Sequence, residues 1–116
     1  TKGYRLPAKF VIHTVGPVWG GGKRKEEDLL RNCYRNSLSL AEKSGAKSVA
    51  FPSISTGAYR FPIETASRVA VQTVVQCLKE MRTVGKVIFV CFSRRDYEIY
   101  RKAIREVPAS DAGAFL

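Results

Sequence analysis

The fold is decided by residues 51–62, which read Phe51-Pro52-Ser53-Ile54-Ser55-Thr56-Gly57-Ala58-Tyr59-Arg60-Phe61-Pro62. The segment begins at the end of an apolar stretch and continues with small residues. It ends at Pro62, where a helical pattern begins. Small side chains let backbone N–H groups approach a ligand, and Gly57 adopts a positive φ without steric cost. The start of the helix adds unpaired N–H groups and a partial positive charge. The segment therefore predicts a strand, an anion-binding loop over residues 55–58, and a helix.

Two aromatic residues, Tyr59 and Phe61, flank the small residues of this loop. They indicate a ligand that carries a ring or a sugar besides phosphate, such as an adenylated or ADP-ribosylated compound. The alternative is an ordinary strand-to-helix turn, because glycine-containing loops often occur without a ligand. The sequence contains no Walker A loop, no G-x-G-x-x-G fingerprint and no G-x-S-x-G elbow, which disfavours the ATPase, dinucleotide and serine-hydrolase readings.

Three apolar, β-branched segments alternate with three segments of helical periodicity. We expect strands over residues 10–15, 47–51 and 86–92, and helices over residues 25–44, 62–82 and 96–107. This alternation predicts an α/β fold with mostly parallel strands, right-handed crossovers and helices that cover the sheet. Ligands of such sheets lie at the carboxyl ends of the strands. The loop at residues 55–59 and the exit from the last strand at Phe92-Ser93 are therefore expected to meet at one site.

Each predicted helix has an apolar face whose residues recur every three or four positions. A glycine, Gly45, follows the first helix, where a left-handed cap is expected. The residues predicted to face inward are Leu30, Cys33, Tyr34, Ser37, Leu38 and Ala41 in the first helix, Ala66, Ala70, Val74, Cys77, Leu78 and Met81 in the second, and Tyr97, Tyr100, Ala103 and Ile104 in the third.

The chain has 116 residues, 45% of them hydrophobic and 26% charged, which is typical of one globular domain. Its longest apolar run, residues 87–92, is too short to cross a bilayer, and no signal-peptide pattern opens it, so we expect a cytoplasmic protein without membrane contact. Three widely spaced cysteines in apolar segments are expected to be buried thiols. The single histidine, His13, is expected to be packed and structural. We therefore expect neither a metal site nor a cofactor.

Basic residues outnumber acidic ones by 20 to 10, which gives a formal net charge of +10 and a pI near 9.9. They gather at residues 23–25, at Arg94-Arg95, and at Arg101, Lys102 and Arg105. Such clusters indicate either a surface for a polyanion or the solvated faces of ordinary helices, and the second explanation is the commoner one.

Three stretches, in this order, resemble the macrodomain family. They are Leu6-Pro7-Ala8-Lys9-Phe10-Val11-Ile12-His13-Thr14-Val15-Gly16-Pro17-Val18-Trp19, then residues 48–62, then Val87-Ile88-Phe89-Val90-Cys91-Phe92. The resemblance covers residues 4–107. It is strongest to the branch of ADP-ribose-binding hydrolases that remove acetyl from O-acetyl-ADP-ribose, or ADP-ribose from acidic side chains.

The resemblance implies a three-layer α/β/α sheet that binds ADP-ribose or O-acetyl-ADP-ribose, with ADP-ribosylated proteins as further partners. In the family's pattern Ser55, Thr56, Gly57 and Ala58 form the diphosphate loop. Tyr59 packs on the distal ribose, and Phe92 lines the adenine and proximal-ribose end of the cleft. The implied reaction is metal-independent hydrolysis of an ester at the distal ribose.

The sequence also departs from the family's pattern. The segment that carries the adenine-reading Asp, and the Asp or Asn that positions the attacking water, does not precede Thr1. We therefore expect residues 1–107 to be the carboxyl-terminal part of a macrodomain with about three strands, and residues 108–116 to be a flexible tail. We expect no catalytic residue, impaired hydrolysis, and an exposed sheet edge that a second copy of the chain completes. The alternative functions are a non-catalytic reader of ADP-ribose or poly-ADP-ribose and, least favoured, a basic nucleic-acid-binding module.

Overall fold

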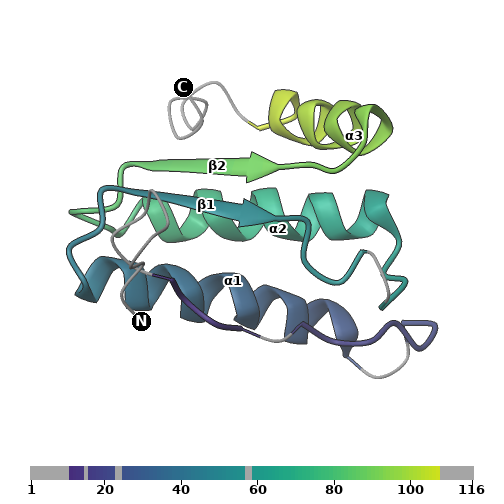
Figure 1. Ribbon diagram of the computed structural model, residues 1–116, viewed down its shortest axis with the longest axis horizontal. Coiled ribbons are helices and arrows are strands. Elements are labelled where there is room, and N and C mark those ends of the chain that lie inside the picture. The colour runs from purple at the N-terminus through teal and green to yellow at the C-terminus, as the bar shows by residue number, and fades with distance from the viewer. Residues whose placement is uncertain (1–10, 15, 23–24, 57–58, 108–116) are drawn as a thin grey trace.

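The computed structural model describes residues 11–14, 16–22, 25–56 and 59–107. Its elements follow in the order α1 (Glu26–Lys43), β1 (Ser48–Pro52), α2 (Ile63–Leu78), β2 (Lys86–Val90) and α3 (Arg94–Arg105). The strands pair in parallel, with Ser48 opposite Lys86 and Pro52 opposite Val90. In Figure 1, α2 lies behind the two strands that it connects, and α3 runs back along β2. The predicted α/β class, with parallel strands and three helices, is confirmed.

The first helix forms as its pattern predicts. All six residues of its predicted inward face are buried. Gly45 has a φ of 77°, and its N–H donates to the Glu42 carbonyl over 3.1 Å. The next amide, of Ala46, donates to the Ala41 carbonyl over 3.0 Å. The left-handed glycine thus ends α1 and turns the chain toward β1, as expected of a glycine cap.

The second helix ends four residues earlier than predicted. Its carboxyl-terminal connection is held by the Glu42 carboxylate of α1, which accepts hydrogen bonds from the backbone N–H groups of Arg82, Thr83 and Val84 over 2.8–3.0 Å. These three N–H groups lie in the turn that leads into β2. Because they are bonded to Glu42, the chain turns at residues where the predicted longer helix would have continued. The interior prediction holds for Ala66, Ala70 and Val74, which are buried, whereas Cys77, Leu78 and Met81 are partly buried.

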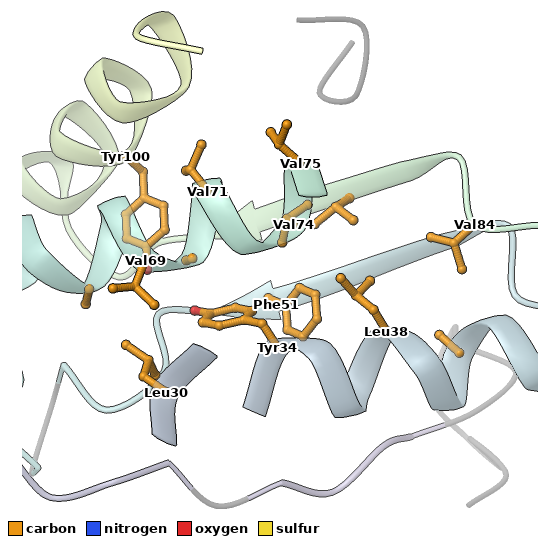
Figure 2. Packing of buried hydrophobic residues seen from close by; sticks show 14 of the residues in the cluster. Leu30, Tyr34, Leu38, Phe51, Val69, Val71, Val74, Val75, Val84 and Tyr100 are labelled. Atoms are coloured by element: carbon orange, nitrogen blue, oxygen red, sulfur yellow. The ribbon is translucent and has the colours of Figure 1, made fainter. Parts of the chain in front are cut away.

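The hydrophobic core lies on one side of the sheet (Figure 2). Phe51, which is 4% exposed, points toward the helices, and Val87 of β2 is 3% exposed. Tyr34 of α1 lies with its ring 4.9 Å from that of Phe51, and Tyr100 of α3 lies 5.1 Å from the ring of Phe89. Aromatic pairs at these distances add to the stabilisation from burial.

The other side of the sheet is bare in the described part of the chain. The residues of β1 and β2 that alternate with the core residues, among them Ala50, Ile88 and Val90, are exposed. All three helices pack on the Phe51 side, because their apolar faces meet only there. The second helical layer of the predicted α/β/α sandwich is therefore not found among the described residues, and β2 is not buried on both faces.

Four smaller predictions are corrected. Residues 11–14 form no strand, because no strand among the described residues pairs with them; residues 10 and 15 lie outside the described part. The side chain of His13 is exposed rather than packed, and Tyr97 is 51% exposed rather than buried. Of the three cysteines, only Cys33 is buried, and the other two are partly exposed. The predicted tail at residues 108–116 lies outside the described residues.

Among the described residues, no helix is both long enough and apolar enough to cross a membrane.

Candidate functional site

The two strands end side by side, and both following helices begin there. Pro52 of β1 pairs with Val90 of β2 in the last register position. The chain continues from β1 into residues 53–61, which we call the ligand loop, and from β2 through Phe92 to the start of α3. Pro62 is the N-cap of α2, and Ser93 is the N-cap of α3. Two positively polarised helix starts thus lie at the edge of the sheet where an anion is favoured.

A chain of hydroxyl groups ties the ligand loop to α3. Thr56 Oγ1 donates to Ser53 Oγ over 2.7 Å and lies 3.1 Å from the Ser53 carbonyl oxygen. Ser53 Oγ lies 3.1 Å from the hydroxyl oxygen of Tyr100, in a buried hydrogen bond between residues 47 positions apart. Burial raises the pKa of Tyr100 above its ordinary value. The loop is therefore anchored at its first turn.

The far half of the loop is closed by backbone hydrogen bonds. The Phe61 N–H donates to the Ser55 carbonyl over 2.8 Å, and the Trp19 N–H donates to the Tyr59 carbonyl over 2.8 Å. The ring of Trp19 lies 4.9 Å from that of Phe61, which is 2% exposed. Sequence reasoning assigned Trp19 no role, because nothing near it in the sequence shows that it supports a loop 40 residues away. The structure makes it a support of the ligand loop.

Two positions of the loop have unusual backbone geometry or packing. Ser55 has a φ of 65°, and Arg60 has a φ of 58°, in the left-handed region that costs a non-glycine residue about 1 kcal/mol. A Cβ on Gly16 would lie 2.0 Å from Ser55 Oγ and 2.6 Å from a methyl carbon of Ile54. A side chain at position 16 would therefore force the side chains of Ser55 and Ile54 to move. Ser55 Oγ is itself buried and has no hydrogen-bond partner among the described residues.

The predicted site residues come from both strand ends. Ser55 and Thr56 lie partly buried in the ligand loop, and Tyr59, in the far half of the same loop, is 38% exposed. Phe92 lies two residues past β2, at the same edge of the sheet, and is 89% exposed. Gly57 and Ala58 lie outside the described residues. The geometry thus brings the described members of the predicted site to one edge, with one exposed aromatic ring in the ligand loop and another just past β2.

Two further ionisable groups near this edge, Cys91 and Glu64, can be described. Burial raises the pKa of the Cys91 thiol, next to the end of β2, which disfavours a reactive thiolate. Glu64 in the first turn of α2 is exposed, where it complements the helix dipole. In the described part of the chain, no three His, Cys, Asp or Glu side chains are grouped so that they can hold a metal ion.

Comparison with known proteins decides the family. The family model of the macro domain matches residues 1–70, a range that contains β1, the whole ligand loop and the start of α2. The chain belongs to the macro domain family. A macro domain-containing protein of Chlorobaculum tepidum is 58% identical over 104 residues, which are 90% of this chain and 60% of that protein.

One further macro domain relative is named for an activity, and another was solved with a ligand. An O-acetyl-ADP-ribose deacetylase of Klebsiella pneumoniae is 48% identical over 103 residues, covering 89% of this chain and 59% of that enzyme. A mutant of the Oceanobacillus iheyensis macrodomain, solved with ADPR, superimposes with a TM-score of 0.84 at 47% identity, covering 90% of this chain and 56% of that one. The chain therefore spans about three fifths of the length of the curated relatives it matches.

Proposed function

We propose that this macro domain chain binds ADP-ribose at the edge where β1 and β2 end. The observation that carries the proposal is the closed ligand loop, which is tied to α3 through Ser53 and Tyr100 and to the preceding segment through Trp19 and Tyr59. Membership of the family and the solved relative with ADPR support the same ligand.

The diphosphate, the distal ribose and the adenine of ADP-ribose can each be assigned to a group at the end of β1 and β2. The diphosphate is assigned to the ligand loop, where small residues and the uncapped start of α2 offer backbone N–H groups; Pro62, the N-cap, makes no side-chain cap hydrogen bond. The exposed ring of Tyr59 is assigned to the distal ribose, and that of Phe92 to the adenine end. Because the loop is held before the ligand arrives, little ordering entropy is lost on binding.

The finer part of the proposal is a hydrolase-type site. In O-acetyl-ADP-ribose, water would attack the acetyl carbonyl, and the bond to the ribose oxygen would break to give acetate and ADP-ribose. The ligand loop would position the distal ribose and stabilise the developing charge. None of the hydrogen bonds described above that hold residues 53–61 involves a carboxylate that could orient the water. We therefore expect this chain to bind the ester and to hydrolyse it slowly.

Calorimetric titration with ADP-ribose tests the binding proposal. We expect micromolar affinity, and a loss of about tenfold for Tyr59→Ala, because the aromatic contact with the ribose is removed. Tyr59→Phe keeps the ring and should keep most of the affinity. Leu40→Ala, on the exposed face of α1, is the control and should bind like the unaltered chain.

Absence of binding by a folded chain, or equal affinity for Tyr59→Ala, would overturn the proposal. The proposed hydrolysis of the acetyl ester is tested in the same samples by measuring acetate release at a saturating concentration of O-acetyl-ADP-ribose. Rapid turnover by this chain would show that hydrolysis does not require a carboxylate beyond the residues described above.

A further inference from the structure

Glu26, the first residue of α1, is a buried carboxylate. It is 2% exposed, whereas the next two acids of the same turn, Glu27 and Asp28, lie at the surface and form ion pairs with arginines. An acid in the first turn complements the helix dipole without being buried. Burial of a carboxylate is costly unless hydrogen bonds satisfy it. The helix dipole therefore does not explain why Glu26 is buried.

The carboxylate of Glu26 holds the glycine loop that precedes α1. The Gly22 N–H donates to Glu26 Oε2 over 2.6 Å, in a partly buried hydrogen bond. Hydrogen bonds to an ionised group are shorter and stronger than neutral ones. Gly21 and Gly22 have φ values of 92° and 85°, a left-handed path that glycine adopts without steric cost. Glu26 thus fixes the position of a loop whose own backbone is permissive.

Gly22 in turn lies against the ring of Trp19. A Cβ on Gly22 would lie 3.0 Å from Cη2 of this ring and 3.6 Å from Cζ2. On the other side of Trp19, its N–H donates to the Tyr59 carbonyl over 2.8 Å, and its ring lies 4.9 Å from that of Phe61. Residues 16–22, which we call the strap, therefore connect Glu26 to the far half of the ligand loop.

The strap contacts the ligand loop at the residue assigned to the distal ribose. The Trp19 N–H fixes the carbonyl of Tyr59, whose side chain is 38% exposed. The next residue, Arg60, has a φ of 58°, a conformation that persists only where the surroundings hold it. A shift of Trp19 would release this part of the backbone. The ring of Tyr59 would then have to be ordered when the ligand binds, which lowers affinity.

We propose that Glu26 is a positioning residue of the ADP-ribose site, which fixes Tyr59 through Gly22 and Trp19 and so sets the affinity for the ligand. The inference rests on the proposed function and extends the site to a residue of α1. Because Glu26 is 2% exposed, it acts through these contacts and not on the ligand itself.

The test combines calorimetric titration with ADP-ribose and the fluorescence of Trp19, which is the single tryptophan of the chain. Glu26→Ala should lower the affinity about fivefold, less than Tyr59→Ala, because the ring of Tyr59 is loosened and not removed. The emission maximum should move to longer wavelength, because the Trp19 ring becomes more exposed to water. Glu26→Gln keeps a neutral acceptor and should give intermediate values.

The matched control is Glu27→Ala, which removes the same charge from the same helical turn. It should leave the ADP-ribose affinity and the Trp19 emission unchanged. Thermal unfolding of each variant, monitored by circular dichroism, confirms that it is folded at the temperature of the titration.

A double variant separates positioning from a general loss of stability. If Glu26 acts through Tyr59, Glu26→Ala should weaken binding little further in a chain that already carries Tyr59→Ala. A general weakening of the fold would instead lower the affinity by the same factor in both backgrounds.

The outcomes separate this inference from the proposed function. Failure of the unaltered, folded chain to bind ADP-ribose removes the proposed function and this inference with it. Binding by the unaltered chain, with equal affinity in Glu26→Ala or an equal loss in the Tyr59→Ala background, overturns this inference alone. If Glu26→Ala does not fold, Gly22→Ala keeps the carboxylate and forces the Trp19 ring to move. Unchanged affinity and emission in that variant would also overturn the inference.

Discussion

At the scale of single residues, the ligand loop depends on positions that accept few side chains. Gly16 has no room for a Cβ beside Ser55, and Ser55 itself holds a left-handed backbone. The small residues of the loop could be predicted as an anion site from their type alone. The roles of Gly16, Trp19 and Ser53 could not, because each depends on a partner that only the folded chain brings close.

Glu42 gives a prediction about stability and pH. Its carboxylate accepts hydrogen bonds from Val84, Arg82 and Thr83 N–H groups, and these bonds hold its pKa below the ordinary value of 4.5. A carboxylate whose pKa is lowered by folding stabilises the fold above its unfolded pKa, and this contribution is lost as pH falls through the folded pKa. Glu42→Gln should therefore lower the melting temperature at pH 7.

The difference in melting temperature between Glu42→Gln and the unaltered chain should shrink as the pH is lowered below 4.5. This difference in melting temperature is measured by thermal unfolding, monitored by circular dichroism at a series of pH values from neutral to acid. Glu80→Gln, an exposed carboxylate in the same connection, is the control and should change little. A difference that stays constant across this range would show that the charge of Glu42 does not act through these amides.

At the scale of elements, the helices were predictable because their apolar periodicity extends over three or more turns. The residues at which the helices end depend on contacts instead of periodicity. The Glu42 carboxylate accepts hydrogen bonds from the backbone of the turn after α2. At the start of α3, the Ser93 hydroxyl accepts a hydrogen bond from the Asp96 N–H over 3.1 Å. The predicted strand at residues 10–15 shows the same limit. Its apolar pattern is clear, but a strand needs a hydrogen-bonding neighbour, which sequence periodicity does not supply.

The link between α3 and the ligand loop gives a second prediction. Tyr100→Phe removes the hydroxyl that is hydrogen-bonded to Ser53 and leaves the ring packed against Phe89. We expect a loss of about 1 kcal/mol in the free energy of unfolding, or about 4–8 °C in melting temperature. The affinity for ADP-ribose should also fall several-fold, because Ser53 and Thr56 lose their anchor.

Calorimetry and thermal unfolding of the same samples measure both effects. Tyr97→Phe removes a hydroxyl from an exposed ring and serves as the matched control, with neither property changed. Lower stability with unaltered ADP-ribose affinity would show that Tyr100 supports the core without positioning the loop.

At the scale of the whole molecule, the described residues place the three helices and the core on one side of the sheet formed by β1 and β2, and the site lies at one end of this sheet. Within the described part of the chain the opposite face is uncovered, and its side chains Ile88 and Val90, 44% and 54% exposed, form an unusual apolar surface. The prediction that a second copy of the chain pairs with the open sheet edge remains a prediction. The family itself could be recognised from three ordered stretches of sequence, whereas the one-sided packing could not be inferred from residue patterns.

The central claim is that ADP-ribose binds at the edge where β1 and β2 end. Its most direct test is a titration of the isotope-labelled chain with ADP-ribose, in which the chemical shifts of the backbone amides are monitored by NMR. The account predicts that the largest shifts fall in residues 53–61 and 91–97, at the shared end of β1 and β2. The amides at the opposite strand ends, around Lys47 and Lys86, should stay unchanged. Shifts confined to the outer face of α1, or no shifts at saturating ligand, would contradict it.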